Sequence, residues 1–212
     1  MKTGKRSRTY VSRIRSEAAQ AARNRVLAAA RRLFVRLGID RVTIAQIAKG
    51  SDVAPSTVYA MFKSKEGILR GLMQAALFGE RFQAASAALD RLSDPVRQIE
   101  LTAGVARAIY ESESSELGLI RGASAFSPAL RKLELEFERM RFDMQEQRMQ
   151  NLFAQSRQKK DLTFEEARRI LWMYTSRDVY RMLVTEGRWS PARYQEWLSA
   201  TLLAALVAPS AL

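Results

Sequence analysis

The sequence predicts an all-α fold on three observations. Gly and Pro together number only fifteen, no run alternates apolar and polar residues as a β-strand would, and long stretches repeat apolar residues at i, i+3, i+4 and i+7. A chain of 212 residues can bury one sizeable core or divide into two domains. We expect about nine helices: a small N-terminal three-helix unit and a larger helical C-terminal domain.

The chain is expected to begin with a flexible basic arm at residues 1–15. This segment has no clear apolar face and carries Lys2, Lys5, Arg6, Arg8, Arg13 and Arg15. The first helix is predicted over 16–37, with Gly38 as its left-handed stop. Its apolar stripe consists of Val26, Ala29, Ala30, Leu33, Phe34 and Leu37.

Short helices follow. Thr43 to Gln46 form a capping box that opens the second helix, and Asp52 tolerates the left-handed backbone of a turn. Pro55 is suited to the first turn of a third helix. Ser64 is placed to cap a fourth helix running towards Leu89, which Gly67, Gly71 and Gly79 would weaken.

Later helix starts are marked by a polar cap before proline or by a second capping box. They are Asp94-Pro95, Ser127-Pro128, Thr163 to Glu166, and Ser190-Pro191. Gly187 is a stop signal, so residues 164–186 and 191–207 are predicted to form a helical hairpin with a short connection.

Positive charge is concentrated at the N-terminal end. Residues 1–65 hold fifteen Lys or Arg and three acidic residues, a net charge of +12 out of +13 for the chain. A positive field confined to one end suits a polyanion-binding module, because each neutralised phosphate releases counterions. A surface that served only solubility would mix both signs.

The composition argues against an enzyme. The chain has no Cys and no His, so the thiolate nucleophile, the commonest general base and the usual zinc ligands are missing. No metal site and no cofactor are expected. Residues 1–16 lack the apolar core of a signal peptide and 198–207 is too short to span a bilayer, so we expect a cytoplasmic protein without a membrane partner.

Two short helices joined by a tight turn have the geometry that inserts a helix N-terminus into the major groove of DNA. Apolar residues can bury the inner face: Ile44, Ile47, Ala48, Val53, Val58 and Phe62. Small or polar groups are left to face outwards: Ser56, Thr57, Tyr59 and Ala60. The pattern predicts a helix-turn-helix.

At this point the sequence resembles a known family. Residues 25–73, RVLAAARRLFVRLGIDRVTIAQIAKGSDVAPSTVYAMFKSKEGILRGLM, look like the N-terminal domain of the TetR family of transcriptional repressors. The matching marks include Gly38, Thr43-Ile44, Ile47-Ala48, Thr57-Val58-Tyr59, Phe62 and Lys65-Glu66. The resemblance implies a DNA-binding domain over 16–65 and a regulatory and dimerisation domain over 66–212.

The same resemblance implies roles for single residues. Thr43 would contact a phosphate, with Gln46 as a weaker candidate, and Lys65 would hold a backbone phosphate. Groove-facing positions are Pro55, Ser56, Thr57, Tyr59 and Ala60. Tyr59 could instead be a partly buried prop and Lys65 a solvated cap, and both alternatives stay open.

Three positions depart from the family pattern: Asp52 stands in place of a turn glycine, Met61 cannot donate to a phosphate, and Ala60 can read little beyond a thymine methyl. Base readout by this helix is therefore expected to be spare. Arg13 and Arg15 could compensate by entering a flanking minor groove, or the arm could attract phosphates without order.

Relatives of this kind commonly bind a small molecule in the body and dimerise through the last two helices. Candidate ligand residues are Phe78, Phe82, Tyr110, Phe126, Phe142, Trp172 and Tyr174, which could equally be ordinary core. Candidate dimer-interface residues are Tyr174, Tyr180, Trp197, Leu198, Leu202 and Leu206.

The sequence thus predicts a homodimeric regulator, most simply a repressor, that binds a palindromic double-stranded DNA operator and is released by a small apolar or aromatic ligand or by a partner. The alternative is a nonspecific nucleic-acid-binding and organising protein, which the concentrated charge and spare base readout would also suit.

Overall fold

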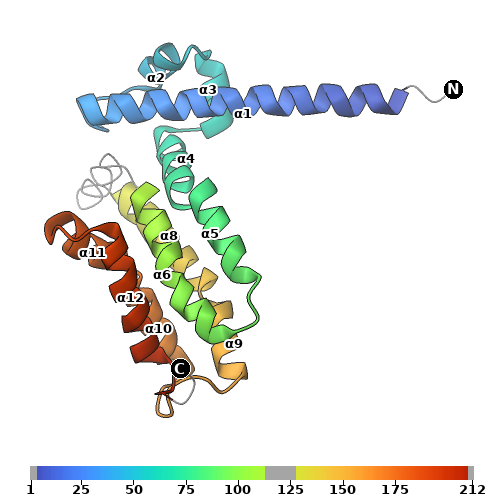
Figure 1. Ribbon diagram of the computed structural model, residues 1–212. Helices are drawn as coiled ribbons and strands as arrows, with labels where there is room; N and C mark the ends of the chain where they lie inside the picture. Colours follow the sequence, from blue (N-terminus) through green and yellow to red (C-terminus); the bar gives the residue numbers. More distant parts are fainter. Residues whose placement is uncertain (1–3, 113–127, 210–212) are drawn as a thin grey trace. The chain divides into compact units, whose positions relative to one another are not determined.

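Helices account for the regular structure of the computed structural model, which describes residues 4–112 and 128–209 (Figure 1). Within these ranges no β-strand forms, and β-type pairing is limited to a bridge between Gln158 and Val207. The all-α class predicted from the apolar periodicity is confirmed.

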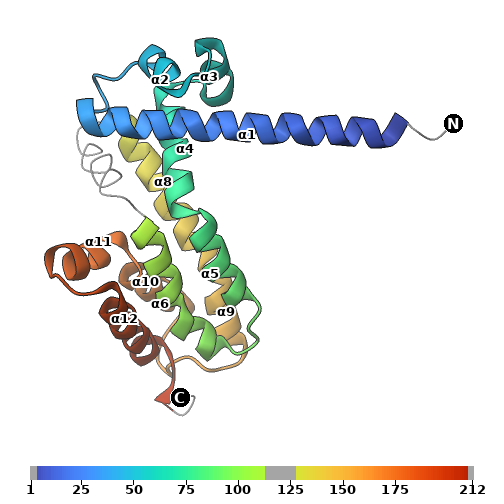
Figure 2. The ribbon, with the colours of Figure 1, turned by 45° about the horizontal axis from the view of Figure 1, so that its top comes forward.

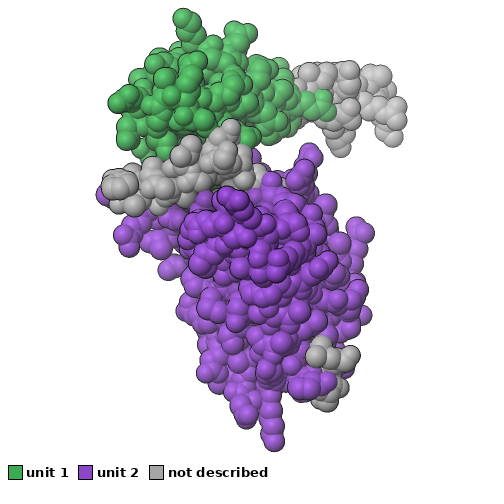
Figure 3. All heavy atoms as spheres, turned by 60° about the vertical axis from the view of Figure 1, so that its left-hand side comes forward, with its two compact units in different colours: residues 1–74, 116–123 green, residues 75–115, 124–212 purple. Residues whose placement is uncertain are grey.

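The chain divides into two compact units (Figure 3). Unit 1 comprises residues 1–74 and 116–123, and unit 2 comprises 75–115 and 124–212. The division at residue 74 lies inside a helix, whereas the sequence placed it at residue 65. Gly71 explains the difference, because a Cβ added there would stand 3.0 Å from Leu27 Cδ2 and 3.1 Å from Phe62 Cε1, so this part of the helix packs in the core of unit 1.

Unit 1 is built on one long helix. Its elements are α1 (Gly4–Leu37), α2 (Ile44–Ser51), α3 (Pro55–Phe62) and most of α4 (Lys65–Leu77). Figure 2 shows α2 and α3 along one side of α1. Val26, Ala29, Ala30 and Phe34 of α1 are buried as the predicted stripe requires, while Leu33 and Leu37 stay half-exposed.

The first helix begins earlier than the sequence indicated. It starts at Gly4 rather than at Ser16, so the predicted flexible arm is continuous with α1. No proline and no further glycine interrupts residues 5–37. A helix already nucleated by its packed half needs no apolar face to continue, because each added residue contributes a hydrogen bond without a new nucleus.

Unit 2 holds the remaining helices, several of which begin where the caps predicted. They are α5 (Glu80–Asp90), α6 (Pro95–Ser112), α8 (Pro128–Met144), α9 (Glu146–Ala154), α10 (Phe164–Tyr174), α11 (Arg177–Tyr180), a π-helical turn (Arg181–Glu186) and α12 (Pro191–Leu206). Asp94 caps α6 by accepting from Val96 N at 3.0 Å. Thr163 and Ser190 cap α10 and α12.

Helix α6 lies at the centre of unit 2, with α12 packed on one side and α5 and α9 on others (Figure 1). Leu198, Leu202 and Leu206 of α12 are completely buried within the single chain. These leucines form part of its core, so the prediction that they lie at a dimer surface does not hold. Periodicity showed that this face is buried, but not that it packs inside the same chain.

Two helices predicted as continuous are broken. The helix expected from Ser64 to Leu89 ends at Leu77, and Gly79 starts α5 in an extended conformation. The first helix of the predicted hairpin ends at Tyr174, because Ser176 caps a new helix by accepting from Val179 N at 3.4 Å. A serine followed by Asp178 is a helix-start signal that the sequence analysis did not use.

Candidate nucleic-acid interface

The N-terminus of α2 carries the predicted capping box. Thr43 Oγ1 accepts from Gln46 N at 3.2 Å, and Gln46 Oε1 accepts from Thr43 N at 2.8 Å. Both side chains are exposed. The oxygen of Gln46 is therefore engaged in capping, whereas its amide NH₂ stays available to an external acceptor.

The turn between α2 and α3 has the geometry expected of a helix-turn-helix. Asp52 adopts a left-handed conformation with φ 53°, and Val53 N donates to Ala48 O at 3.2 Å. Two arginines of α1 hold the end of α2: Arg25 donates to Ser51 O and Arg32 to Gly50 O, each at 3.3 Å. Cations at a helix C-terminus complement its dipole, so α1 fixes the position of the turn.

Helix α3 buries one face and exposes the other. Val58 and Phe62 are buried, as predicted. Of the predicted groove-facing residues, Thr57 is half-exposed and the others are exposed: Pro55, Ser56, Tyr59 and Ala60. Tyr59 is 53% exposed, so its ring is not the buried prop that the sequence left open.

The N-terminus of α3 has no side-chain cap. Pro55 occupies the first turn, as predicted, and the N-cap residue Ala54 has no side chain that could accept a hydrogen bond. First-turn N–H groups normally seek an acceptor, and the partial positive charge of a helix N-terminus favours an anion. The end of α3 that carries Ser56 and Thr57 is thus suited to acidic or polar groups from outside.

Lys65 is engaged inside unit 1. Its Nζ donates to the carbonyl oxygen of Ile39 at 2.8 Å and lies 3.5 Å from that of Asp40. The ammonium ties the start of α4 to the α1–α2 connection, a structural contact that the sequence did not suggest. A lysine has three N–H donors, so a phosphate contact stays a prediction.

Other basic groups of unit 1 are free to meet solvent. Arg15 is exposed, and the side chain of Arg13 lies outside the described residues. Sequence reasoning did not single out Arg41, Lys49 and Lys63, which are exposed beside the ends of α2 and α3. Their signal was available, since each lies within or no more than three residues from a helix of the helix-turn-helix.

Unit 2 contains a pocket open to solvent, with about 380 Å³ of empty space. Its walls are Phe78, Phe82, Thr102, Val105, Ala106, Ile109, Arg141, Met144, Gln145, Arg148 and Thr175. Of the predicted ligand residues, the pocket includes Phe78 and Phe82. Phe126 lies outside the described residues.

The other predicted ligand residues belong to packed aromatic clusters rather than to the pocket wall. Tyr110 packs on Tyr180, with ring centroids 5.4 Å apart. Phe142 meets Trp172 edge to face at 6.3 Å, and Tyr174 meets Trp197 in the same way at 6.3 Å. The core interpretation that the sequence left open fits these side chains.

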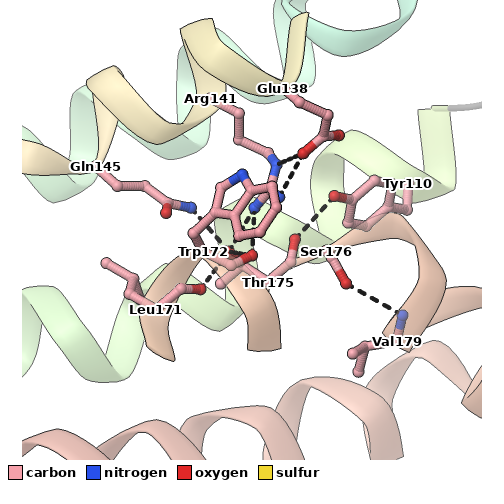
Figure 4. A network of polar contacts seen from close by, with 9 residues as sticks. All are labelled: Tyr110, Glu138, Arg141, Gln145, Leu171, Trp172, Thr175, Ser176 and Val179. Atoms are coloured by element: carbon pink, nitrogen blue, oxygen red, sulfur yellow. Dashed lines mark hydrogen bonds and ion pairs between the residues drawn. The ribbon is translucent and has the colours of Figure 1, made fainter. Parts of the chain in front are cut away.

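A polar network centred on Thr175 borders the pocket (Figure 4). Thr175 Oγ1 donates to Leu171 O at 2.7 Å and accepts from Arg141 at 2.9 Å and from Gln145 Nε2 at 2.8 Å. Its carbonyl oxygen accepts from the hydroxyl of Tyr110 at 2.8 Å. The pocket wall is thereby bonded to the break between α10 and α11.

The described ranges 4–112 and 128–209 contain no group of three or more acidic side chains that could hold a metal ion. Within the same ranges, every helix is too short or too polar to cross a lipid bilayer.

The sequence and the fold have recognisable relatives. Residues 26–72 match the family described as bacterial regulatory proteins, tetR family. No curated protein matches the sequence significantly. Solved structures with a similar fold include NalD, the secondary repressor of the MexAB-OprM multidrug efflux pump in Pseudomonas aeruginosa, at 21% identity and a TM-score of 0.71, covering 91% of this chain and 98% of NalD.

Two further structures were solved with small molecules. The SmeT–triclosan complex has 18% identity and a TM-score of 0.71, over 91% of this chain and 94% of SmeT. The transcriptional regulator FadR from Bacillus subtilis, in complex with stearoyl-CoA, has 16% identity and a TM-score of 0.66, over 85% of this chain and 97% of FadR. At such identities the likeness shows the shared fold. Residues 26–72 thus carry the helix-turn-helix of the tetR family of bacterial regulatory proteins, and the chain shares its fold with solved transcriptional regulators.

Proposed function

We propose that the protein is a homodimeric repressor that binds a palindromic operator through α3 and is released when a small molecule occupies the pocket of unit 2. The observation that carries the DNA-binding role is α3 itself. Its N-terminus lacks a side-chain cap and exposes Ser56, Tyr59 and Ala60 beside a half-exposed Thr57. Ser and Thr hydroxyls can bond base edges, and an exposed Tyr can reach a phosphate or a thymine methyl.

The phosphate backbone would be held by groups around α3. Thr43 stands at the N-terminus of α2, where the helix dipole favours an anion. Arg15, Arg41, Lys49 and Lys63 supply exposed positive charge. Such contacts position the helix on DNA without reading its sequence. Arg13 and Arg15 lie in the N-terminal half of α1, outside the half that packs in unit 1. This position is compatible with contacts to DNA beside the bases that α3 would read.

Dimerisation is assigned to the surface formed by α10, α11, the π-helical turn and α12. Met173 and Met182 are 47% and 49% exposed there, and Tyr174, Tyr180 and Trp197 are half-exposed. Large apolar and aromatic side chains of this kind are typical of the centre of an interface. In a two-fold dimer the two α3 helices would enter successive major grooves about 34–36 Å apart.

Release by a ligand is supported by the pocket and its connection to Thr175. SmeT and FadR, which share the fold, were solved with triclosan and stearoyl-CoA. A ligand would act by favouring a dimer in which the two reading helices are misplaced for the operator. The network of Arg141, Gln145 and Thr175 leads from the pocket to the segment assigned to dimerisation.

A selection experiment tests the DNA-binding role. Duplexes of random sequence are enriched on the full-length protein, and the affinity for the enriched duplex is compared with that for its scrambled version at physiological salt. We expect an inverted repeat and a preference of about a thousandfold or more. The spare readout by Ala60 favours a second candidate, a nonspecific nucleic-acid organiser, and equal affinity for both duplexes would establish that candidate instead.

A further inference from the structure

The pocket of unit 2 contains an arginine with no fixed partner. Arg148 of α9 is 7% exposed, and among the described residues it forms no hydrogen bond and no ion pair. The Asp90 carboxylate acts on Arg148 only through a longer-range electrostatic interaction. Burial lowers the pKa of the Arg148 guanidinium and the Asp90 carboxylate opposes that shift, yet a guanidinium stays charged at neutral pH.

Two other largely covered arginines of the unit, by contrast, have acidic partners. Arg141 bonds Glu138 at 2.7 Å, and Arg168 bonds Glu146 at 3.1 Å while lying over the ring of Phe142. A buried charge without a partner destabilises a fold, and an apolar side chain of the same size would cost less. The guanidinium of Arg148, with Nε buried and unsatisfied, is therefore available to an anion that enters the pocket.

Gln145 adds a second unsatisfied group to the same wall. Its Nε2 is committed to Thr175 Oγ1, whose own proton goes to Leu171 O, so the amide cannot usefully be reversed. Gln145 Oε1 is left buried without a donor. A hydrogen-bond donor on a ligand, or a water brought with it, would satisfy this oxygen.

The rest of the wall is largely apolar. Phe78, Phe82, Val105, Ala106, Ile109 and Met144 surround the space, with Thr102 as a further polar group. The empty space of about 380 Å³ includes part of the solvent at the pocket mouth, so the enclosed part suits only a small occupant. The occupant that fits both parts has one charged end and a compact apolar or aromatic body.

We propose that the ligand is a small organic monocarboxylate whose carboxylate pairs with Arg148 and whose apolar body packs between Phe78, Phe82 and the α6 side chains. This assignment rests on the proposed function, in which the same pocket is the site of release. It replaces the purely apolar or aromatic ligand that the sequence suggested by one with a defined charge.

Binding is measured without DNA, by calorimetry on the full-length protein. The probes are 4-phenylbutyrate, its neutral alcohol 4-phenylbutanol, its cationic analogue 4-phenylbutylamine and 4-phenylbutyl phosphate. We expect the carboxylate to bind about 10- to 100-fold more tightly than the alcohol, and the amine not to bind, because one charge-assisted hydrogen bond contributes an effect of that size. Tighter binding of the phosphate ester would overturn the carboxylate as the preferred ligand group, while supporting Arg148 as the residue that binds the anion.

Arg148→Met removes the charge and retains the length of the side chain. It should lose the preference for the carboxylate over the alcohol, Arg148→Lys should keep part of it, and Arg139→Met, at an exposed position of α8, should keep all of it. Without ligand, Arg148→Met should melt no lower than the wild type, because a buried unpaired charge has been removed. A lower melting temperature would show a structural arginine.

The two proposals fail in different ways. Equal binding of alcohol and carboxylate, or no binding of any probe, would overturn the assignment to Arg148 and leave the operator binding intact. Tight carboxylate binding that leaves the protein bound to its selected duplex would sustain the assignment to Arg148, whereas it would overturn release as the outcome of binding.

Discussion

Gly67 lies so close to Phe62 that a Cβ atom added to Gly67 would stand 1.8 Å from the carbonyl oxygen of Phe62. The glycine that weakens α4 as a helix is thus what lets α4 begin directly under the end of α3. Gly67→Ala should lower the free energy of unfolding of unit 1 by about 1–3 kcal/mol, because the backbone has to move. Thermal melting followed by circular dichroism measures the loss, and operator affinity should fall with it.

Gly50 provides the matched control. It lies in α2, and a Cβ there would meet Ala29 and Leu33 at 3.7 Å, an ordinary contact. Gly50→Ala should therefore be neutral or stabilise by about 0.5–1 kcal/mol, since glycine is a poor helix residue. Equal destabilisation by both substitutions would contradict the close approach at Phe62 as the specific cause of the loss at Gly67.

Ser56 and Thr57 are predicted to read bases, so their loss should affect only the operator. Each change to alanine should weaken binding to the selected duplex by about 1 kcal/mol, roughly fivefold, with little effect on the scrambled duplex. Fluorescence anisotropy with both duplexes provides the comparison. Because Thr57 is half-exposed, its variant must also keep the wild-type melting temperature.

Lys65→Met should have two effects that Ser56→Ala lacks. The melting temperature should fall, because the hydrogen bond to Ile39 O contributes about 1 kcal/mol to unit 1. Binding should weaken on both duplexes, and the slope of log affinity against log salt should become shallower if the ammonium also contacts a phosphate. Lys63→Met, at an exposed position, should change the salt slope without lowering the melting temperature. An unchanged melting temperature for Lys65→Met would contradict the first assignment.

The helix-turn-helix could be predicted closely because its determinants are local. The capping box of Thr43, the left-handed Asp52 and the first-turn Pro55 each act within a few residues, and the structure has all three. The contact of Lys65 with Ile39 could not be predicted in this way, because it joins segments separated by 26 positions in the chain. The same holds for Gly67, whose need for a missing Cβ arises only when α3 and α4 pack.

The body was less predictable, for a physical reason. Apolar spacing in α12 identified Leu198 and Leu202 as buried, but burial against α6 and burial against a second chain leave the same pattern. Arg148 had no sequence signal at all, since a lone arginine in a polar stretch reads as exposed. What distinguishes it is the absence of a partner in a packed interior, and only the fold reveals that.

Glu166 should give α10 a stability that depends on pH. Hydrogen bonds from the Thr163 hydroxyl and backbone N–H, at 2.7 and 2.9 Å, hold the pKa of Glu166 below its ordinary value. A carboxyl with a lowered folded-state pKa stabilises the fold above its unfolded pKa and loses that effect as pH falls through the folded one. Glu166→Gln keeps a neutral capping side chain, so wild type should melt higher at pH 7 and the difference should shrink below about pH 4.5. A difference that stays constant down to pH 3 would exclude this carboxylate as its source.

Two buried tyrosines of unit 2 should respond in opposite ways to loss of the hydroxyl. Tyr110 donates to Thr175 O at 2.8 Å, so Tyr110→Phe leaves a buried carbonyl without that donor and should destabilise by about 1 kcal/mol.

Tyr194 is fully buried with no partner for its hydroxyl, and burial raises the pKa of that group above its ordinary value. Tyr194→Phe removes an unsatisfied polar atom from an otherwise unchanged ring, so it should leave stability unchanged or raise it by about 1 kcal/mol. Chemical denaturation of both variants measures the contrast, and destabilisation of both by the same amount would mean that the hydroxyl of Tyr194 has a partner in solution.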